Sequence, residues 1–198
     1  MNISEDLPLI LTQNGTLIDN MTTATKVTLI TVTFLIVFLG ILGNTFVLIA
    51  SLKYRAINID RISILLIEHM AAADLLIAVI EYLPLLVVVI ADGNWVLGNW
   101  VCKIQAYAKF PPFVAETIII MTMACYRAHV VLNPPFVPIS IGWFYLFVGF
   151  AWIFPAMNCV IIQVTRPTAH FRPAQLSCSI LGMTRLDVSI ITRIVGGQ

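Results

Sequence analysis

The sequence has very few charged residues. Of 198 residues, 11 are Lys or Arg and 10 are Asp or Glu, a charged fraction of 11%, whereas soluble domains carry about 25%. So few charges cannot cover the surface of a soluble globule of this size. The net charge of +1 leaves no excess of one sign to attract nucleic acid, and 60% hydrophobic content excludes disorder. We therefore expect a membrane protein with no nucleic-acid partner.

The sequence also lacks the short motifs of nucleotide-binding proteins and hydrolases. It contains no phosphate loop, dinucleotide fingerprint or nucleophile elbow, and no internal repeat. Its 4 Cys and 3 His do not show the spacing of a zinc site. We therefore do not expect an enzyme.

Long apolar segments make up most of the chain. Residues 27–52 and 137–165 carry no charge, and residues 62–91 and 101–132 carry a few ionisable groups. At about 1.5 Å rise per residue, each segment is long enough to cross a hydrocarbon core of about 30 Å as a helix. Their aliphatic composition favours helices over a barrel. A last apolar segment begins near residue 186, so we expect an all-α transmembrane bundle with the start of a fifth span.

The first 25 residues form a polar tail with glycosylation sequons at Asn2, Asn14 and Asn20. Glycan addition requires this tail to face the lumen during synthesis. The basic residues after the first span, beginning with Lys53, favour a cytoplasmic loop. We therefore expect a glycosylated extracellular tail over residues 1–25 of a multi-pass plasma-membrane protein.

Several short motifs occur in an informative order along the chain. They are Gly43-Asn44, Ala71-Ala72-Ala73-Asp74-Leu75, Trp95-Val96-Leu97-Gly98, Cys102, Arg127, Pro134, Trp152 and Cys178. Each is weak alone, but together they resemble the rhodopsin-like (class A) family of seven-helix G-protein-coupled receptors. The resemblance implies a receptor domain over residues 26–198, a seven-helix fold truncated after about four and a half helices.

The resemblance implies roles for several of these residues. Cys102 and Cys178 correspond to the family's disulfide, which joins the third span to the second outer loop. Arg127 and Pro134 correspond to the face that meets a heterotrimeric G protein. The implied partners are therefore a G protein inside the cell, an extracellular ligand outside it, and membrane lipid.

The sequence departs from the family at several positions on the third span. Tyr126 replaces the acid that precedes the arginine in the family's Asp-Arg-Tyr, so the ion pair that restrains Arg127 at rest is absent. We therefore expect easier activation without ligand. Lys109 replaces the aspartate that binds amines, so charge repulsion disfavours an amine ligand. Pro111-Pro112 removes two backbone donors and should kink the helix.

Charged side chains within spans predict a ligand pocket in the outer half of the bundle. Glu81 and Lys109 form either an ion pair that contacts ligand or a structural pair between the second and third spans. Gln105, Phe110 and Phe113 share the helix face of Lys109 and complete the candidate pocket. For the two phenylalanines, packing or lipid contact is the alternative role.

A second polar site is expected at mid-membrane. By resemblance, Asp74 occupies the position where many relatives hold sodium, and Glu116 replaces the small polar residue that faces it. Two carboxylates in this low-dielectric space cannot both stay ionised without a cation. We expect them to share a proton rather than hold Na⁺ with Asn44, unless the proline pair turns Glu116 away. We expect Glu68, nearer the cytoplasmic end, to reach the membrane interface.

Two other functions compete with that of a receptor. A complete four-span structural or adhesion protein, such as a tetraspanin or claudin, has a similar length. However, the Cys-Cys-Gly run of tetraspanins is absent, no second outer-loop cysteine lies near Cys102, and the apolar start near residue 186 would be unexplained. A transporter would account for the buried charges, but inverted repeats are absent. A G-protein-coupled receptor for a ligand other than a simple amine remains the expected function.

Overall fold

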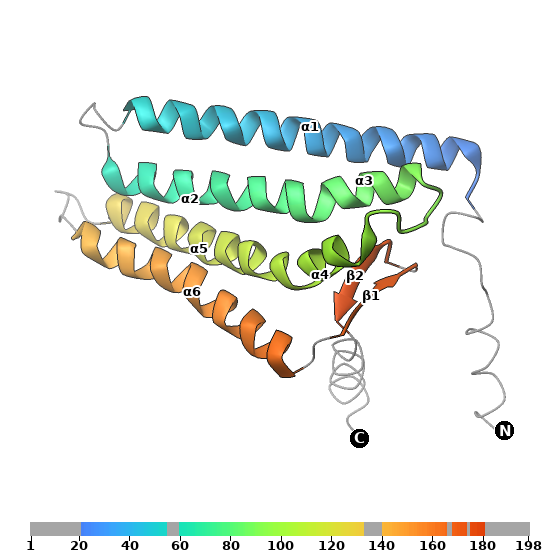
Figure 1. Ribbon diagram of the computed structural model, residues 1–198. Helices are drawn as coiled ribbons and strands as arrows, with labels where there is room; N and C mark the ends of the chain where they lie inside the picture. The colour runs from blue at the N-terminus through green and yellow to red at the C-terminus, as the bar shows by residue number, and fades with distance from the viewer. Residues whose placement is uncertain (1–20, 55–59, 133–139, 166–167, 174, 181–198) are drawn as a thin grey trace, which may run out of the picture.

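The computed structural model describes residues 21–54, 60–132, 140–165, 168–173 and 175–180. These residues form a bundle of long helices with a small hairpin at one end (Figure 1). In chain order the elements are α1 (Thr23–Tyr54), α2 (Arg61–Ile77), the π-helical turn η1 (Ala78–Tyr82), α3 (Leu83–Ile90), α4 (Gly98–Ala108), α5 (Phe110–Leu132), α6 (Ile141–Thr165), β1 (Ala169–Arg172) and β2 (Ser177–Ile180).

Within the described part of the chain, four helical segments are long and apolar enough to cross a membrane. They are α1, the continuous α2–η1–α3, the continuous α4–α5, and α6. Many of their large apolar side chains are exposed, among them Phe46 at 73% and Val131 at 75%. Such surfaces are stable against lipid tails, because the tails are as apolar as these side chains.

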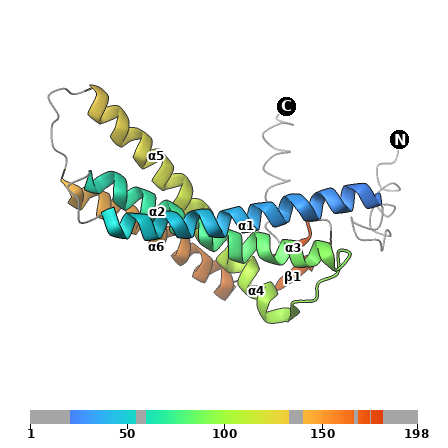
Figure 2. The ribbon, with the colours of Figure 1, turned by 90° about the horizontal axis from the view of Figure 1, so that it is seen from above.

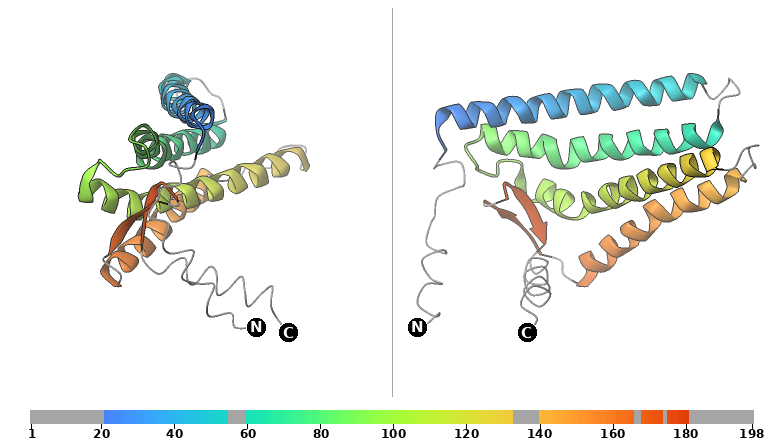
Figure 3. Two further views of the ribbon diagram at one scale, coloured as in Figure 1. Left: turned by 90° about the vertical axis from the view of Figure 1, so that its right-hand side faces the viewer. Right: turned by 180° about the vertical axis from the view of Figure 1, so that it is seen from behind.

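The spans lie side by side, with α2 between α1 and α5 (Figure 1) and with α6 packed against α5. Seen from above, α5 crosses the direction of α1 and α2 steeply (Figure 2). The hairpin lies at the same end as the start of α1 and of α4 (Figure 3). We call this the hairpin end, and the end where α5 stops and α6 starts the opposite end.

The core follows this arrangement in two main clusters. The larger one joins α2, α5 and α6, and its most buried members are Leu66, Ala115, Ile119 and Ala151. The second lies under the hairpin, where residues of α4 such as Tyr107 pack against both strands. Helix α5 is therefore held along one side by α2 and along another by α6.

Prolines interrupt two of the spans. Pro84 has no N–H to donate to the carbonyl four residues earlier, and just before it the chain widens into η1, where the Leu83 amide donates to the Ala78 carbonyl five residues back. The prediction that Pro111 and Pro112 disturb the third span agrees with the end of α4 at Ala108 and the start of α5 at Phe110. Both interruptions lie in the half of the bundle nearer the hairpin.

One carbonyl released by the proline pair finds a partner on a neighbouring span. Pro111 cannot donate to the Tyr107 carbonyl, and the Cys159 thiol of α6 donates to that oxygen at 3.2 Å. From the sequence alone, a cysteine at this position within a span is expected only to pack against apolar neighbours. The structure adds a hydrogen bond that stabilises the break in the third span.

The hairpin is absent from the sequence-based expectation, which places only a polar stretch there. Strands β1 and β2 pair antiparallel with Phe171 opposite Cys178. Cys178 forms a disulfide with Cys102 of α4, as the resemblance implied, across a sequence separation of 76 residues. In the chain-entropy model a bridge over a loop of this length contributes about 4 kcal/mol. It fixes the hairpin on the third span.

Candidate functional site

A connected polar network lies at the hairpin end, between the second span, the third span and β2. Glu81 Oε2 accepts a hydrogen bond from Gln105 Nε2 at 3.3 Å and lies 3.5 Å from Lys109 Nζ. Lys109 Nζ also donates to Ser177 Oγ at 3.4 Å. Gln105 Oε1 accepts from the Cys178 amide at 2.8 Å. The network therefore joins both spans to the hairpin that covers them.

The proline interruptions lie beside the charged members of this network. Glu81 belongs to the π-helical turn that precedes Pro84. Lys109 lies between α4 and α5, directly before the proline pair. A π turn changes the direction of the side chains that it carries, and such turns are frequent at functional sites. A proline three residues after a charged residue within a span is the sequence signal that could have predicted this turn.

Lys109 is held loosely by its partners. Its distances to Glu81 Oε2 and Ser177 Oγ are 3.5 Å and 3.4 Å, whereas strong charge-assisted hydrogen bonds are about 2.8 Å. The side chains of Lys109 and Glu81 are 24% and 20% exposed. The pair thus connects two spans and is also reachable, so the two roles left open by the sequence are compatible.

Gln105 is the buried centre of the network. It is 1% exposed, and both ends of its amide are engaged, one by the Glu81 carboxylate and one by the Cys178 backbone. Phe110 and Phe113, expected beside it in the pocket, are 43% and 41% exposed on α5. The structure therefore places Gln105 within the network and leaves the two phenylalanines on its periphery.

Aromatic side chains support the loop before α4. Trp95 Nε1 donates to the Gly98 carbonyl at 2.8 Å, and its ring lies 5.4 Å from that of Phe171 in β1. Trp95 is thus a packing anchor for the hairpin. Trp152 packs against the core of α2, α5 and α6, and its Nε1 has no hydrogen-bond partner among the described residues.

The mid-membrane residues singled out by the sequence come together between α1, α2 and α5. Asn44 donates to the Gly40 carbonyl at 2.9 Å and forms a side-chain hydrogen bond with Asp74. Glu116 of α5 lies close enough to Asp74 for their charges to interact. Asn44 and Asp74 are thus joined by a hydrogen bond, with Glu116 nearby.

At the opposite end, Arg127 is exposed on α5, and none of the described residues forms an ion pair with it. Pro134 lies outside the described residues, as do the sequons at Asn2, Asn14 and Asn20. Tyr126, by contrast, is 5% exposed and forms a hydrogen bond with Asp60, the residue before α2. Sequence analysis missed Asp60 as a site residue.

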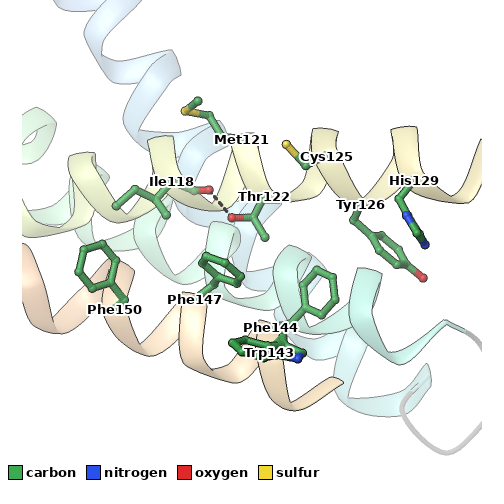
Figure 4. A pocket seen from close by; sticks show the side chains of 10 residues that line it. All are labelled: Ile118, Met121, Thr122, Cys125, Tyr126, His129, Trp143, Phe144, Phe147 and Phe150. Carbon is green, nitrogen blue, oxygen red and sulfur yellow. Dashed lines mark hydrogen bonds between the residues drawn. The ribbon is translucent and has the colours of Figure 1, made fainter. Parts of the chain in front are cut away.

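Sequence analysis also missed a groove of about 710 Å³ between α5 and α6 (Figure 4). It is lined by Ile118, Met121, Thr122, Cys125, Tyr126, His129, Trp143, Phe144, Phe147 and Phe150. Thr122 is satisfied within its own helix, since its hydroxyl donates to the Ile118 carbonyl at 2.7 Å. The groove is mainly aromatic and aliphatic, which suits a surface within the membrane.

Comparison with known proteins decides the family. The sequence model for the 7 transmembrane receptor (rhodopsin family) matches residues 43–195. The chain belongs to this family. Its disulfide, its helical spans and its ordered motifs are thus those of a rhodopsin-family receptor, a class of receptors rather than enzymes, and a multi-pass membrane protein.

Several rhodopsin-family relatives are similar to the chain over part of their length. Neuropeptide Y receptor type 2 of Gallus gallus is 27% identical over 141 residues, which cover 71% of this chain and 34% of that receptor. Dopamine receptor 2 of Caenorhabditis elegans is 32% identical over 48% of the chain and 11% of its own length. Leukotriene B4 receptor 1 of Bos taurus is 32% identical over 48% of the chain and 26% of its own length. The chain thus spans about a third or less of these receptors.

The first prediction concerns Gln105. Gln105→Leu leaves the Cys178 amide without its buried acceptor, which costs about 1–3 kcal/mol and lowers the unfolding midpoint in lipid nanodiscs by several degrees. Gln105→Glu keeps the acceptor but sets a second carboxylate against Glu81, so we expect at least as large a loss. The matched control is Asn99→Leu on the exposed face of α4. Equal midpoints for Gln105→Leu and Asn99→Leu would show that the network does not stabilise this end.

Proposed function

We propose that the chain acts in a G-protein-coupled receptor of the plasma membrane, with the hairpin end outside the cell. In this orientation the polar network forms the floor of an extracellular ligand site, and Arg127 faces a heterotrimeric G protein. The observation that carries the proposal is the network itself, because it sets a reachable Lys109–Glu81 pair beneath a disulfide-bonded hairpin.

The proposed ligand site disfavours a simple amine. A ligand ammonium would approach Lys109 at the position where amine receptors of this family carry an acid, and like charges repel. The three relatives above are named for neuropeptide Y, dopamine and leukotriene B4, which are different ligands. The site therefore supports a ligand that engages the Lys109–Glu81 pair from outside.

We further propose that Asp74 and Glu116 share one proton at mid-membrane. Their charges interact, and Asn44 already donates to Asp74. Two adjacent carboxylates in a medium of low dielectric constant repel each other strongly unless one is neutral or a cation lies between them. The shared proton is favoured because the second acid supplies a site for it, and Na⁺ is the competing solution.

The receptor proposal is tested first by the coding sequence beyond codon 198. It predicts three further apolar spans, and the longer product should promote nucleotide exchange on a purified heterotrimeric G protein. Arg127→Ala should abolish this exchange, whereas Lys53→Ala, at the same end of the bundle, should leave most of it. A stop codon directly after codon 198 would contradict the receptor proposal.

The proton pair is tested on the chain itself in nanodiscs. Infrared spectra at neutral pH should show a protonated carboxyl band, and Glu116→Gln or Asp74→Asn should remove it. Addition of NaCl in place of KCl should not raise the unfolding midpoint. An unfolding midpoint that rises with Na⁺, without a carboxyl band, would identify a sodium site. The absence of both the band and the Na⁺ dependence would reject a coupled pair.

A further inference from the structure

The side chain of Tyr126 is fixed at both ends. Its ring is 5% exposed and packs edge-on against Phe144 of α6, with centroids 5.3 Å apart. Figure 4 shows both rings between the ribbons of α5 and α6. The Tyr126 hydroxyl forms a hydrogen bond with Asp60, in which the phenol donates and the carboxylate accepts. The phenol thus connects α5 to the residue that precedes α2.

Asp60 uses both carboxylate oxygens. Oδ1 accepts from the Ile62 amide at 3.1 Å, which caps α2, and Oδ2 accepts from Ser63 Oγ at 2.7 Å. Burial raises the pKa of Asp60, but the hydrogen bonds from Ser63, Tyr126 and the backbone outweigh it and hold the pKa below its usual 3.8. Because this pKa is lowered, the stabilising contribution of the carboxylate is complete at neutral pH and is lost only as the pH falls through the folded-state value.

This contact has a particular place in the chain. Tyr126 precedes Arg127, the residue proposed to face the G protein, and it stands where the family has an acid. In this chain a phenol stands at that position on the third span, and it bonds to a carboxylate at the start of the second. Asp60, directly before α2, therefore contacts the residue next to Arg127.

We propose that Asp60 and Tyr126 form a latch between the second and third spans that holds the end of α5, and with it Arg127, in its resting position. This inference rests on the proposed function for its regulatory meaning, but the latch itself is a property of the chain. Asp60 is a positioning residue, since it acts on Arg127 through Tyr126. Release of the hydrogen bond frees the end of α5 to move away from α2.

The latch reverses one expectation from the sequence. Without Asp60 in view, an acid at position 126 should restore the restraint on Arg127. Tyr126→Asp removes the phenol that donates to Asp60 and adds a second negative charge on the same side of α5, and like charges repel. The substitution should therefore loosen the end of α5 at least as much as loss of the phenol hydroxyl alone.

The test is hydrogen exchange of backbone amides in the full chain in nanodiscs. Tyr126→Phe keeps the ring and removes only the hydroxyl, so exchange in residues 127–132 should rise about tenfold, the loss expected for one hydrogen bond to a charged group. Asp60→Asn should give a smaller rise, because an uncharged acceptor remains. Adding it to Tyr126→Phe should change nothing more in this segment.

Two controls separate a latch from a helix cap. Ser63→Ala removes another bond to Asp60 and should raise exchange only in residues 61–66, at the start of α2. Tyr145→Phe removes an exposed phenol hydroxyl on α6 and should leave residues 127–132 unchanged. The proposal is overturned if Tyr126→Phe leaves exchange in that segment within about twofold of the unmodified chain, or if Tyr145→Phe raises it equally.

Nucleotide exchange on a heterotrimeric G protein tests the proposed function separately. If the gene's longer product couples, Tyr126→Phe should raise its basal exchange. A product that does not couple at all would reject the receptor proposal while the amide data still decide the latch. A coupled product whose basal exchange is unmoved by Tyr126→Phe would reject the regulatory role.

Discussion

The structure depends on a constraint set by lipid, which offers no hydrogen bonds to backbone or side chains. Each proline within a span releases a carbonyl, and each polar side chain there needs a partner from a neighbouring helix. A π turn accommodates the missing N–H of Pro84. The Tyr107 carbonyl released by Pro111 accepts a hydrogen bond from the Cys159 thiol. The two charged residues of the network at the hairpin end lie at these two interruptions. The proline interruptions of the backbone therefore also position the charged residues of the candidate ligand site.

The same constraint explains how the second and third spans are held together. Apolar packing discriminates little between a neighbouring helix and lipid, so polar contacts contribute much of the specificity. Such contacts occur at three depths: Glu81 with Gln105 and Lys109, Asp74 with Glu116, and Asp60 with Tyr126. The contact at the hairpin end involves partly exposed side chains, and the contact at the opposite end adjoins Arg127. A rearrangement of these two spans would thus involve both proposed functional surfaces.

Much of this architecture was predictable from the sequence, because hydrophobic length determines spans and ordered motifs determine the family. The Cys102–Cys178 bridge followed from the resemblance, and the proximity of Glu81 and Lys109 from their expected depth. The hairpin and the hydrogen bond between Asp60 and Tyr126 were not predicted, since each depends on contacts between distant segments. The π turn was also missed, although its cause, Pro84, is local. The interfacial position expected for Glu68 was wrong. It is 8% exposed, because it lies on the packed side of α2.

We infer that the π turn before Pro84 directs Glu81 toward Lys109. A double-mutant cycle with Glu81→Gln and Lys109→Gln, measured by unfolding of the chain in nanodiscs, should give a coupling energy of up to about 1 kcal/mol. In a Pro84→Ala background, where a regular α-helix turns Glu81 away, the coupling should disappear. Coupling that persists unchanged with Pro84→Ala would contradict the account.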